Sequence, residues 1–145
     1  MTLGDELQAV LPELRQMAES RMTTTIEIRH LTGKTDQDEE TGEEVPLYVS
    51  EGELLCRIPP AKTAASSDDS GGQLVIRTER EVHISTSAAE IPSGRILVVT
   101  QPGVGADPTL AGAMCRVVDS SGADQATARR MRVEWIRPME MQEAP

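Results

Sequence analysis

The spacing of apolar residues changes once along the chain, and the change separates a predicted helix from a predicted β domain. Between Asp5 and Met22 the apolar positions recur every three or four residues, which places them on one side of an α-helix. These positions are Leu7, Val10, Leu14, Met17 and Ala18. Pro12 removes one intrahelical hydrogen-bond donor, so either the first turns form a separate piece or Pro12 lies early in a kinked helix. We expect an amphipathic helix within residues 1–22.

After Met22 apolar and polar residues alternate, which is typical of strands with one buried face. The stretch TTTIEIRHL puts Ile26 and Ile28 on one face and Glu27 and Arg29 on the other. Similar stretches, bounded by Gly, Pro, Asp or Ser, lie at 45–49, 53–58, 73–84, 94–100, 114–118 and 129–137. The sequence therefore predicts a mainly β fold over residues 23–137, a small β-barrel or sandwich of about six or seven strands, followed by a C-terminal tail at 138–145.

Two connections in this pattern are long. Residues 33–44, GKTDQDEETGEE, are acidic and begin with glycine, which predicts a solvated hairpin tip. Its acidic residues are Asp36, Asp38, Glu39, Glu40, Glu43 and Glu44. Residues 59–72, PPAKTAASSDDSGG, are small and polar without periodicity, which predicts a flexible loop.

The stretch RRMRVEWI gathers three of the 14 Lys and Arg residues into its first four positions. Alternation puts Met131, Val133 and Trp135 on one face of a half-buried closing strand. The opposite face carries Arg130, Arg132 and Glu134. We expect this polar row to meet carboxylates, either on a neighbouring strand or on a neighbouring subunit, and the sequence leaves both alternatives open.

Composition narrows the classes of function. A chain of 145 residues fits one domain, whose core must consist of aliphatic side chains and seven Met because Phe is absent. A net charge of -10 weighs against a sequence-reading DNA-binding protein. No apolar run approaches the roughly 18 residues that cross a bilayer, and the acidic N-terminal stretch does not resemble a signal peptide. We expect a soluble, cytoplasmic protein without a membrane partner.

The residues that could carry catalysis lie in structural contexts. Cys56 and Cys115 occur in apolar, strand-like stretches, which predicts buried, reduced thiols. His30 and His83 each lie within an alternating stretch, and no nucleophile with an orienting acid accompanies either one. We therefore expect a protein that is not an enzyme and has no catalytic residue.

The acidic stretch that begins at Asp36 has the alternate carboxylates of an EF-hand calcium loop. Thr41 stands where that loop needs glycine, and Leu47 stands where it needs the bidentate Glu. We expect an acidic turn with no resident metal or other cofactor, and weak cation binding remains as the alternative.

The order of these features resembles that of the small head-tail connector proteins of tailed actinobacterial phages, the head-closure or stopper class. The matching parts are RHLTG with ETG, and DPTLAG followed by ATARR, and the similarity runs from the helix to Ile136. The resemblance implies a structural virion protein of the phage neck, assembled in the host cytoplasm. It implies a homo-oligomeric ring, six-fold in preference to twelve-fold, between the portal or adaptor and the tail terminator or tail tube. Such a ring closes the DNA channel after packaging, and DNA passes through it without sequence-specific binding.

Within this resemblance the long connections and the polar row acquire roles. The acidic hairpin residues would line or rim the channel, because carboxylates repel the DNA backbone. Arg130, Arg132 and Glu134 would lie at the subunit interface. The loop at 59–72 would gate the channel, because small residues and paired glycines permit large dihedral changes. Its gating candidates are Ser66, Ser67, Asp68, Asp69, Gly71 and Gly72.

Two other functions fit the same pattern. A stand-alone cytoplasmic β-barrel of the OB or SH3 type would bind a protein or peptide and stay a functional monomer. Another neck or tail-completion protein, an adaptor or a tail terminator, would differ in position only. We expect an adaptor to be mainly helical, which the strand-rich pattern opposes.

Overall fold

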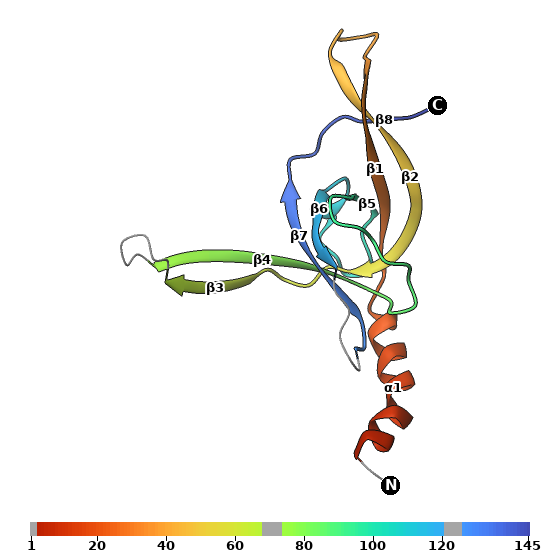
Figure 1. Cartoon of the computed structure of the whole chain (residues 1–145), viewed down its shortest axis with the longest axis vertical. Helices are drawn as coiled ribbons and strands as arrows, with labels where there is room; N and C mark the ends of the chain where they lie inside the picture. The colour runs from red at the N-terminus through yellow and green to blue at the C-terminus, as the bar shows by residue number, and fades with distance from the viewer. Residues whose placement is uncertain (1–2, 68–73, 121–125) are drawn as a thin grey trace.

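A computed structural model describes residues 3–67, 74–120 and 126–145, and at 62–67 and 74–79 it describes the backbone. The chain is mainly β with one N-terminal α-helix, which confirms the predicted fold class (Figure 1). Its elements are α1 (Leu3–Ser20), β1 (Thr24–Gln37), β2 (Glu44–Arg57), β3 (Lys62–Ser67), β4 (Leu74–Ile84), β5 (Ile96–Gln101), the 3-10 helix η1 (Pro108–Leu110), β6 (Met114–Ser120), β7 (Arg129–Ile136) and β8 (Gln142–Glu143).

The strands of the described residues form one sheet, which curls round until β2 pairs with β4. Their order is β3-β4-β7-β6-β5-β1-β2-β8, and β2 also pairs with β4. That additional pairing consists of Cys56 with Ile84 and Arg57 with His83. Among the described residues only these two pairs join β2 to β4, so the strands from β4 to β2 form a ring that is less regular than a continuous barrel.

The inward faces of the ring build the main core. Ile26, Ile84 and Met131 are at most 1% exposed, and the described part of the core contains aliphatic, Met and Cys side chains with Trp135 packed at its edge. Burial alternates along β1 and β7, as the sequence pattern predicts. The sequence pattern predicts burial correctly on these strands because one face of each packs on the core and the other does not.

β5 departs from alternation, since the four residues from Ile96 to Val99 are all buried. Ile96 and Val98 belong to a second apolar cluster, against which Met139 and Met141 of the C-terminal segment pack. The segment at 138–145, expected to be a trailing tail, therefore covers the second face of β5. Flexible Met side chains fill irregular spaces between packed elements. Within the same segment, β8 pairs with β2.

The helix differs in detail from its prediction. α1 is one helix with Pro12 inside it, so the alternative of two separate pieces was wrong, and Pro12 lies near the middle of the helix where an early position had been the other alternative. It points away from the ring of strands, opposite the far end of the β1–β2 hairpin (Figure 1). Within the described residues, no helix has the length and hydropathy that crossing a membrane would require.

The predicted loop at 59–72 also differs from the structure. Residues Lys62–Ser67 form β3, which pairs with β4 from Lys62 opposite Glu79 to Ser67 opposite Leu74. These two strands leave the ring as an arm (Figure 1). The loop interpretation was wrong for 62–67 because small polar residues carry no alternation, and the strand is specified by its backbone pairing with β4.

Candidate functional site

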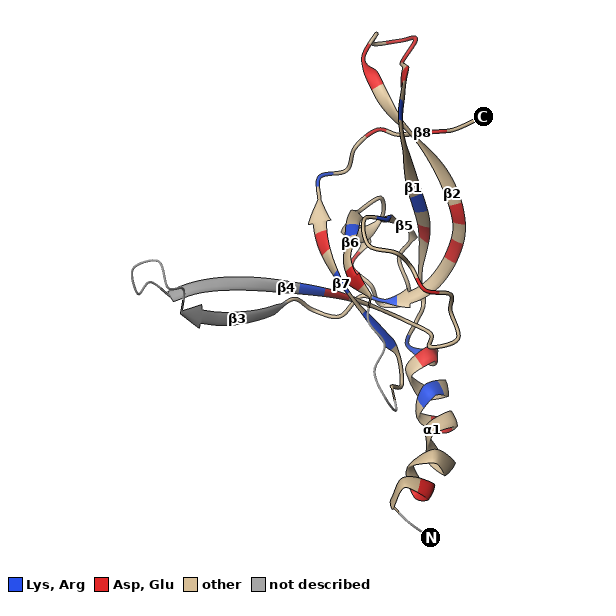
Figure 2. Cartoon of the chain, viewed as in Figure 1, with Lys and Arg blue, Asp and Glu red and all other residues tan. Residues whose placement is uncertain are grey.

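The acidic hairpin is an extension of β1 and β2 beyond the ring (Figure 2). Its end is held by backbone hydrogen bonds, from Asp38 N to Glu43 O at 2.8 Å and from Gly42 N to Asp38 O at 2.8 Å. Gly42 has a φ of 73°, a conformation that glycine adopts without a steric penalty. The acidic tip is thus an ordered turn that presents its carboxylates on a defined scaffold.

The carboxylates of this tip face solvent without a cation to neutralise them. Asp36, Glu39, Glu40, Glu43 and Glu44 are exposed. Asp38 is half-buried, and its side chain accepts a hydrogen bond from Glu40 N at 3.0 Å. None of these six residues forms an ion pair with any residue that the structure describes. The hairpin therefore carries a concentrated negative potential at one end of the molecule.

The apolar stripe of α1 (Leu7, Val10, Leu14 and Met17) is uncovered. These side chains are 37%, 44%, 41% and 59% exposed, and α1 has no buried residue among those described. An amphipathic helix in a globular protein normally gains most of its stability by packing such a stripe. The described part of the chain therefore leaves this stripe partly exposed and buries none of it.

The helix is attached to the ring mainly near its C-terminal end. Arg15 Nε donates to Ala126 O at 3.0 Å, and Ser85 Oγ donates to Glu19 Oε1 at 2.6 Å. Met22, just after the helix, is 4% exposed. These contacts fix the direction of α1 while the exposed stripe remains accessible.

The polar row of β7 lies as predicted, with Arg130, Arg132 and Glu134 exposed and Met131 and Val133 buried. Arg132 Nη2 lies 3.6 Å from Asp119 Oδ2 of the adjacent strand β6. For Arg132, the alternative of a carboxylate on a neighbouring strand is therefore realised within the chain. Arg130 and Glu134 have no ion pair with a described residue.

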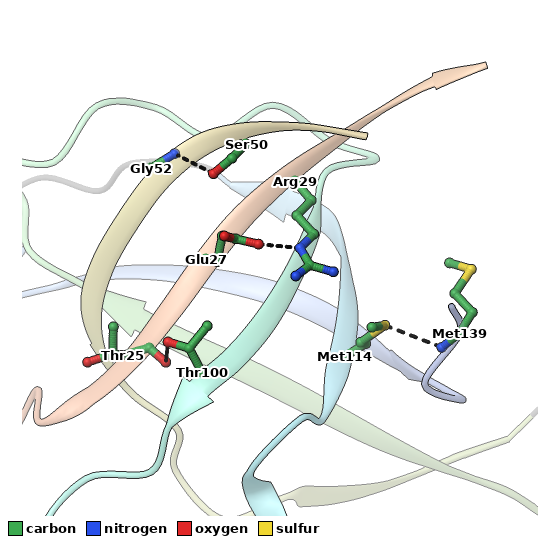
Figure 3. A network of polar contacts seen from close by, with 8 residues as sticks. All are labelled: Thr25, Glu27, Arg29, Ser50, Gly52, Thr100, Met114 and Met139. Carbon is green, nitrogen blue, oxygen red and sulfur yellow. Dashed lines mark hydrogen bonds and ion pairs between the residues drawn. The ribbon is translucent and has the colours of Figure 1, made fainter. Parts of the chain in front are cut away.

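One ion pair on β1 lies beside an aromatic ring of β2. Glu27 and Arg29, both on β1, form an ion pair (Figure 3). The Arg29 guanidinium lies 4.1 Å from the Tyr48 ring centroid. Tyr48 stands on β2 and is 9% exposed. These contacts hold β1 against β2 below the acidic tip.

The gating candidates are only partly described. Ser66 and Ser67 are the last residues of β3 and pair with Val75 and Leu74 of β4. Asp68, Asp69, Gly71 and Gly72 lie outside the described residues. The gating role stays a prediction.

The histidines and cysteines have structural surroundings. His83 Nε2 lies 2.9 Å from Glu81 Oε2, whereas His30 is exposed. Cys56 and Cys115 are free and buried, as predicted, and burial raises the pKa of both thiols to about 12. In the part of the chain that the structure covers, no three His, Cys, Asp or Glu side chains are grouped so that they could hold a metal ion.

Sequence reasoning singled out Arg130 but missed two arginines that line a pocket with it. Arg21 follows α1, and Arg57 ends β2. Alternation could have placed Arg57 on the outward face of its strand, because Arg57 and the buried Cys56 must point to opposite faces. Which strands would be neighbours could not be read from that pattern.

The fold and surfaces define a mainly β chain with an uncovered amphipathic helix and an acidic hairpin at opposite ends. Residues 14–134 match the model of a family of unknown function, DUF6093, and the chain belongs to this family. No curated protein matched the chain.

Proposed function

We propose that this protein is a structural subunit of a phage neck, a head-tail connector or stopper whose ring closes the DNA channel after packaging. The observation that carries the proposal is the uncovered apolar stripe of α1. Support also comes from the sequence resemblance and from the acidic hairpin at the opposite end of the molecule (Figure 2).

The stripe favours assembly over an isolated monomer. Fully burying one large aliphatic side chain contributes roughly 1.5–3 kcal/mol, so the four partly exposed side chains of the stripe would together add several kcal/mol to an interface. The proposed ring requires the stripe of one copy to pack on a different surface of the next copy, which is a heterologous contact. Heterologous contacts close into rings when the rotation between copies permits.

The acidic hairpin supports a channel through which DNA moves. Fixed cations would bind phosphates by releasing counterions, whereas carboxylates repel them and leave the DNA free to slide. The proposal places Asp36, Asp38, Glu39, Glu40, Glu43 and Glu44 at the rim or wall of the channel.

A deletion of the gene from the phage, examined by electron microscopy of the lysate, tests this function. We expect heads that have lost DNA beside finished but unattached tails, and restoration by the wild-type gene. The variant Val10→Glu/Leu14→Glu should fail to restore particles, because it charges the stripe. Its control, Gln8→Glu/Gln16→Glu, adds the same charge to α1 outside the stripe and should restore them.

Normal infectious particles from the deletion lysate would contradict the proposal and favour a stand-alone binding module. A stripe variant that restores particles as well as its control would remove the assembly role of α1. Thermal unfolding of the purified variants checks their folding, and since these positions are exposed we expect little change in the melting temperature.

A further inference from the structure

A small pocket lies where the end of α1 meets strands β2, β4 and β7. Its volume is about 160 Å³. The residues that line it are Ala18, Arg21, Met22, Arg57, His83, Thr127, Ala128 and Arg130. In a chain of net charge -10, three arginines around one pocket is an unexpected concentration of positive charge.

Strand register explains how the cations come together. Arg57 of β2 is the partner of His83 on β4, and His83 is the partner of Arg130 on β7. Paired residues on adjacent antiparallel strands project from the same face of a sheet. These three residues therefore form one row across three strands, and Arg21 adds a further guanidinium from the turn after α1.

In the next row on the same face, carboxylates lie beside the arginine. There Arg132 of β7 stands in register between Glu81 of β4 and Asp119 of β6, and its Nη2 lies 3.6 Å from Asp119 Oδ2. In the pocket row His83 is paired, since its Nε2 lies 2.9 Å from Glu81 Oε2. The three arginines are not, because Arg21, Arg57 and Arg130 form no ion pair with any residue in the described ranges.

Arg57 and Arg130 lie on the two strands that flank β4, and like charges that share one face of a sheet repel each other. The chain has 24 Asp and Glu residues, yet the described ones leave this row without a partner for its arginines. An anion from outside the chain would remove the repulsion.

We propose that this pocket binds a phosphate group. Guanidinium groups present forked donors that match phosphate oxygens, and the Thr127 hydroxyl adds a further donor at the pocket wall. A phosphate monoester or free phosphate carries more acceptor oxygens and more charge than a carboxylate, so it balances three arginines more closely. The pocket has room for one such group. Phosphate binding here does not depend on the proposed neck function.

Isothermal titration calorimetry of the full chain with inorganic phosphate, thymidine monophosphate and a short DNA duplex tests the site at constant ionic strength. We expect Arg130→Gln to weaken binding about tenfold or more, since a hydrogen bond to a charged group is worth that factor. The matched control is Arg132→Gln, which makes the same change two positions along β7 and should alter the affinity less than about twofold.

The arms of the titration separate the sources of the phosphate. Binding of the two small ligands alone assigns a free phosphate or nucleotide, and binding of the duplex with the same dependence on Arg130 assigns a nucleic-acid backbone. If Arg130→Gln does not fold, Arg21→Gln, exposed after α1, should give the same loss.

Two results would overturn the proposal. One is equal affinity of Arg130→Gln and Arg132→Gln for every phosphate ligand, or no binding of any of them to the wild type. The other is tighter binding of the carboxylate peptide DQDEETGEE than of phosphate, which would assign the pocket to the acidic hairpin of a second copy.

Discussion

Cys56 and Cys115 lie inside the ring, 0% and 2% exposed, and burial raises the pKa of each thiol from 9.0 to about 12. The negative form of either thiol is disfavoured there because it would lose hydration. The unfolded chain releases these protons near pH 9, whereas the folded chain retains them until about pH 12. The thiols therefore favour the folded state fully below pH 9, and this contribution is lost as the pH rises from 9 toward 12.

The first prediction is that the free energy of unfolding falls over this alkaline range. Urea unfolding at a series of pH values measures it. The double variant Cys56→Ala/Cys115→Ala should be less stable near neutral pH, because it leaves small cavities, but its stability should fall less steeply above pH 9. An equal slope for both proteins would mean that the thiols do not titrate in this way.

Gly103 packs against the start of β1, and its backbone N–H donates to Thr24 Oγ1 at 3.1 Å. A Cβ at this position would lie 2.6 Å from the Thr23 carbonyl carbon and 2.8 Å from Thr24 N. Backbone atoms cannot move aside as a flexible side chain would.

The second prediction is that Gly103→Ala lowers the free energy of unfolding by about 1–3 kcal/mol, because the turn must move away from β1. Thermal or urea unfolding measures the loss. Gly4→Ala in the exposed α1 makes the same chemical change where the helical backbone accepts alanine, and it should not destabilise the protein. Full stability of Gly103→Ala would show that the close approach is not needed.

This residue also marks a limit of sequence reasoning. The stretch QPGVGADPT is recognisable as a turn between strands, because it contains glycine and proline. The need for glycine at 103 comes from Thr23 and Thr24, which are distant in the sequence. A single sequence does not specify which backbones approach each other.

At the scale of elements, α1 combines a helical pattern with an internal proline. Pro12 lies inside the helix, where it removes a hydrogen bond and crowds the preceding turn. The cost of proline inside a helix is roughly 3 kcal/mol relative to alanine. With its apolar stripe uncovered, α1 has little packing energy to offset that cost.

The third prediction is that Pro12→Ala increases helicity of the isolated chain. Far-UV circular dichroism should show a stronger helical signal, while the melting temperature of the β ring changes little because α1 contacts it mainly near its C-terminal end. The exposed control Gln16→Ala removes no proline and should change the signal much less. A helical signal that stays unchanged in Pro12→Ala would show that α1 is fully formed despite the proline.

Elements with an alternating face were predictable, and elements specified by their neighbours were not. β1 and β7 follow their apolar periodicity because one face of each is buried. β3 and β8 have no such pattern, and they exist through backbone pairing with β4 and β2. The C-terminal segment was expected to trail after Pro138, and the pattern of its Met residues does not reveal which cluster they cover.

The candidate site was also predictable only where it depends on local sequence. The acidic hairpin and the outward face of β7 follow from local sequence, although β1 continues to Gln37 and β2 begins at Glu44, so the turn is shorter than expected. Their roles at a channel and an interface stay predictions. The pocket that joins Arg21, Arg57 and Arg130 requires the order and register of three strands. That information is a property of the whole sheet.

At the scale of the whole molecule, the features that would contact partners are separated in space. The acidic hairpin extends from one end of the ring, and α1 with its uncovered stripe extends from the other (Figure 2). The β3–β4 arm leaves the ring in a third direction (Figure 1). A subunit that presents such extensions around a small core suits an assembly in which each extension contacts a different neighbour.

The fourth prediction concerns that assembly, and a cryo-electron microscopy map of the neck of the intact phage particle tests it most directly. We expect copies of this chain in a closed ring between the portal or adaptor and the tail, with α1 packed on a neighbour and residues 36–44 at the channel. Absence of the chain from the neck, or a ring whose acidic hairpins all point to the outside, would contradict the account.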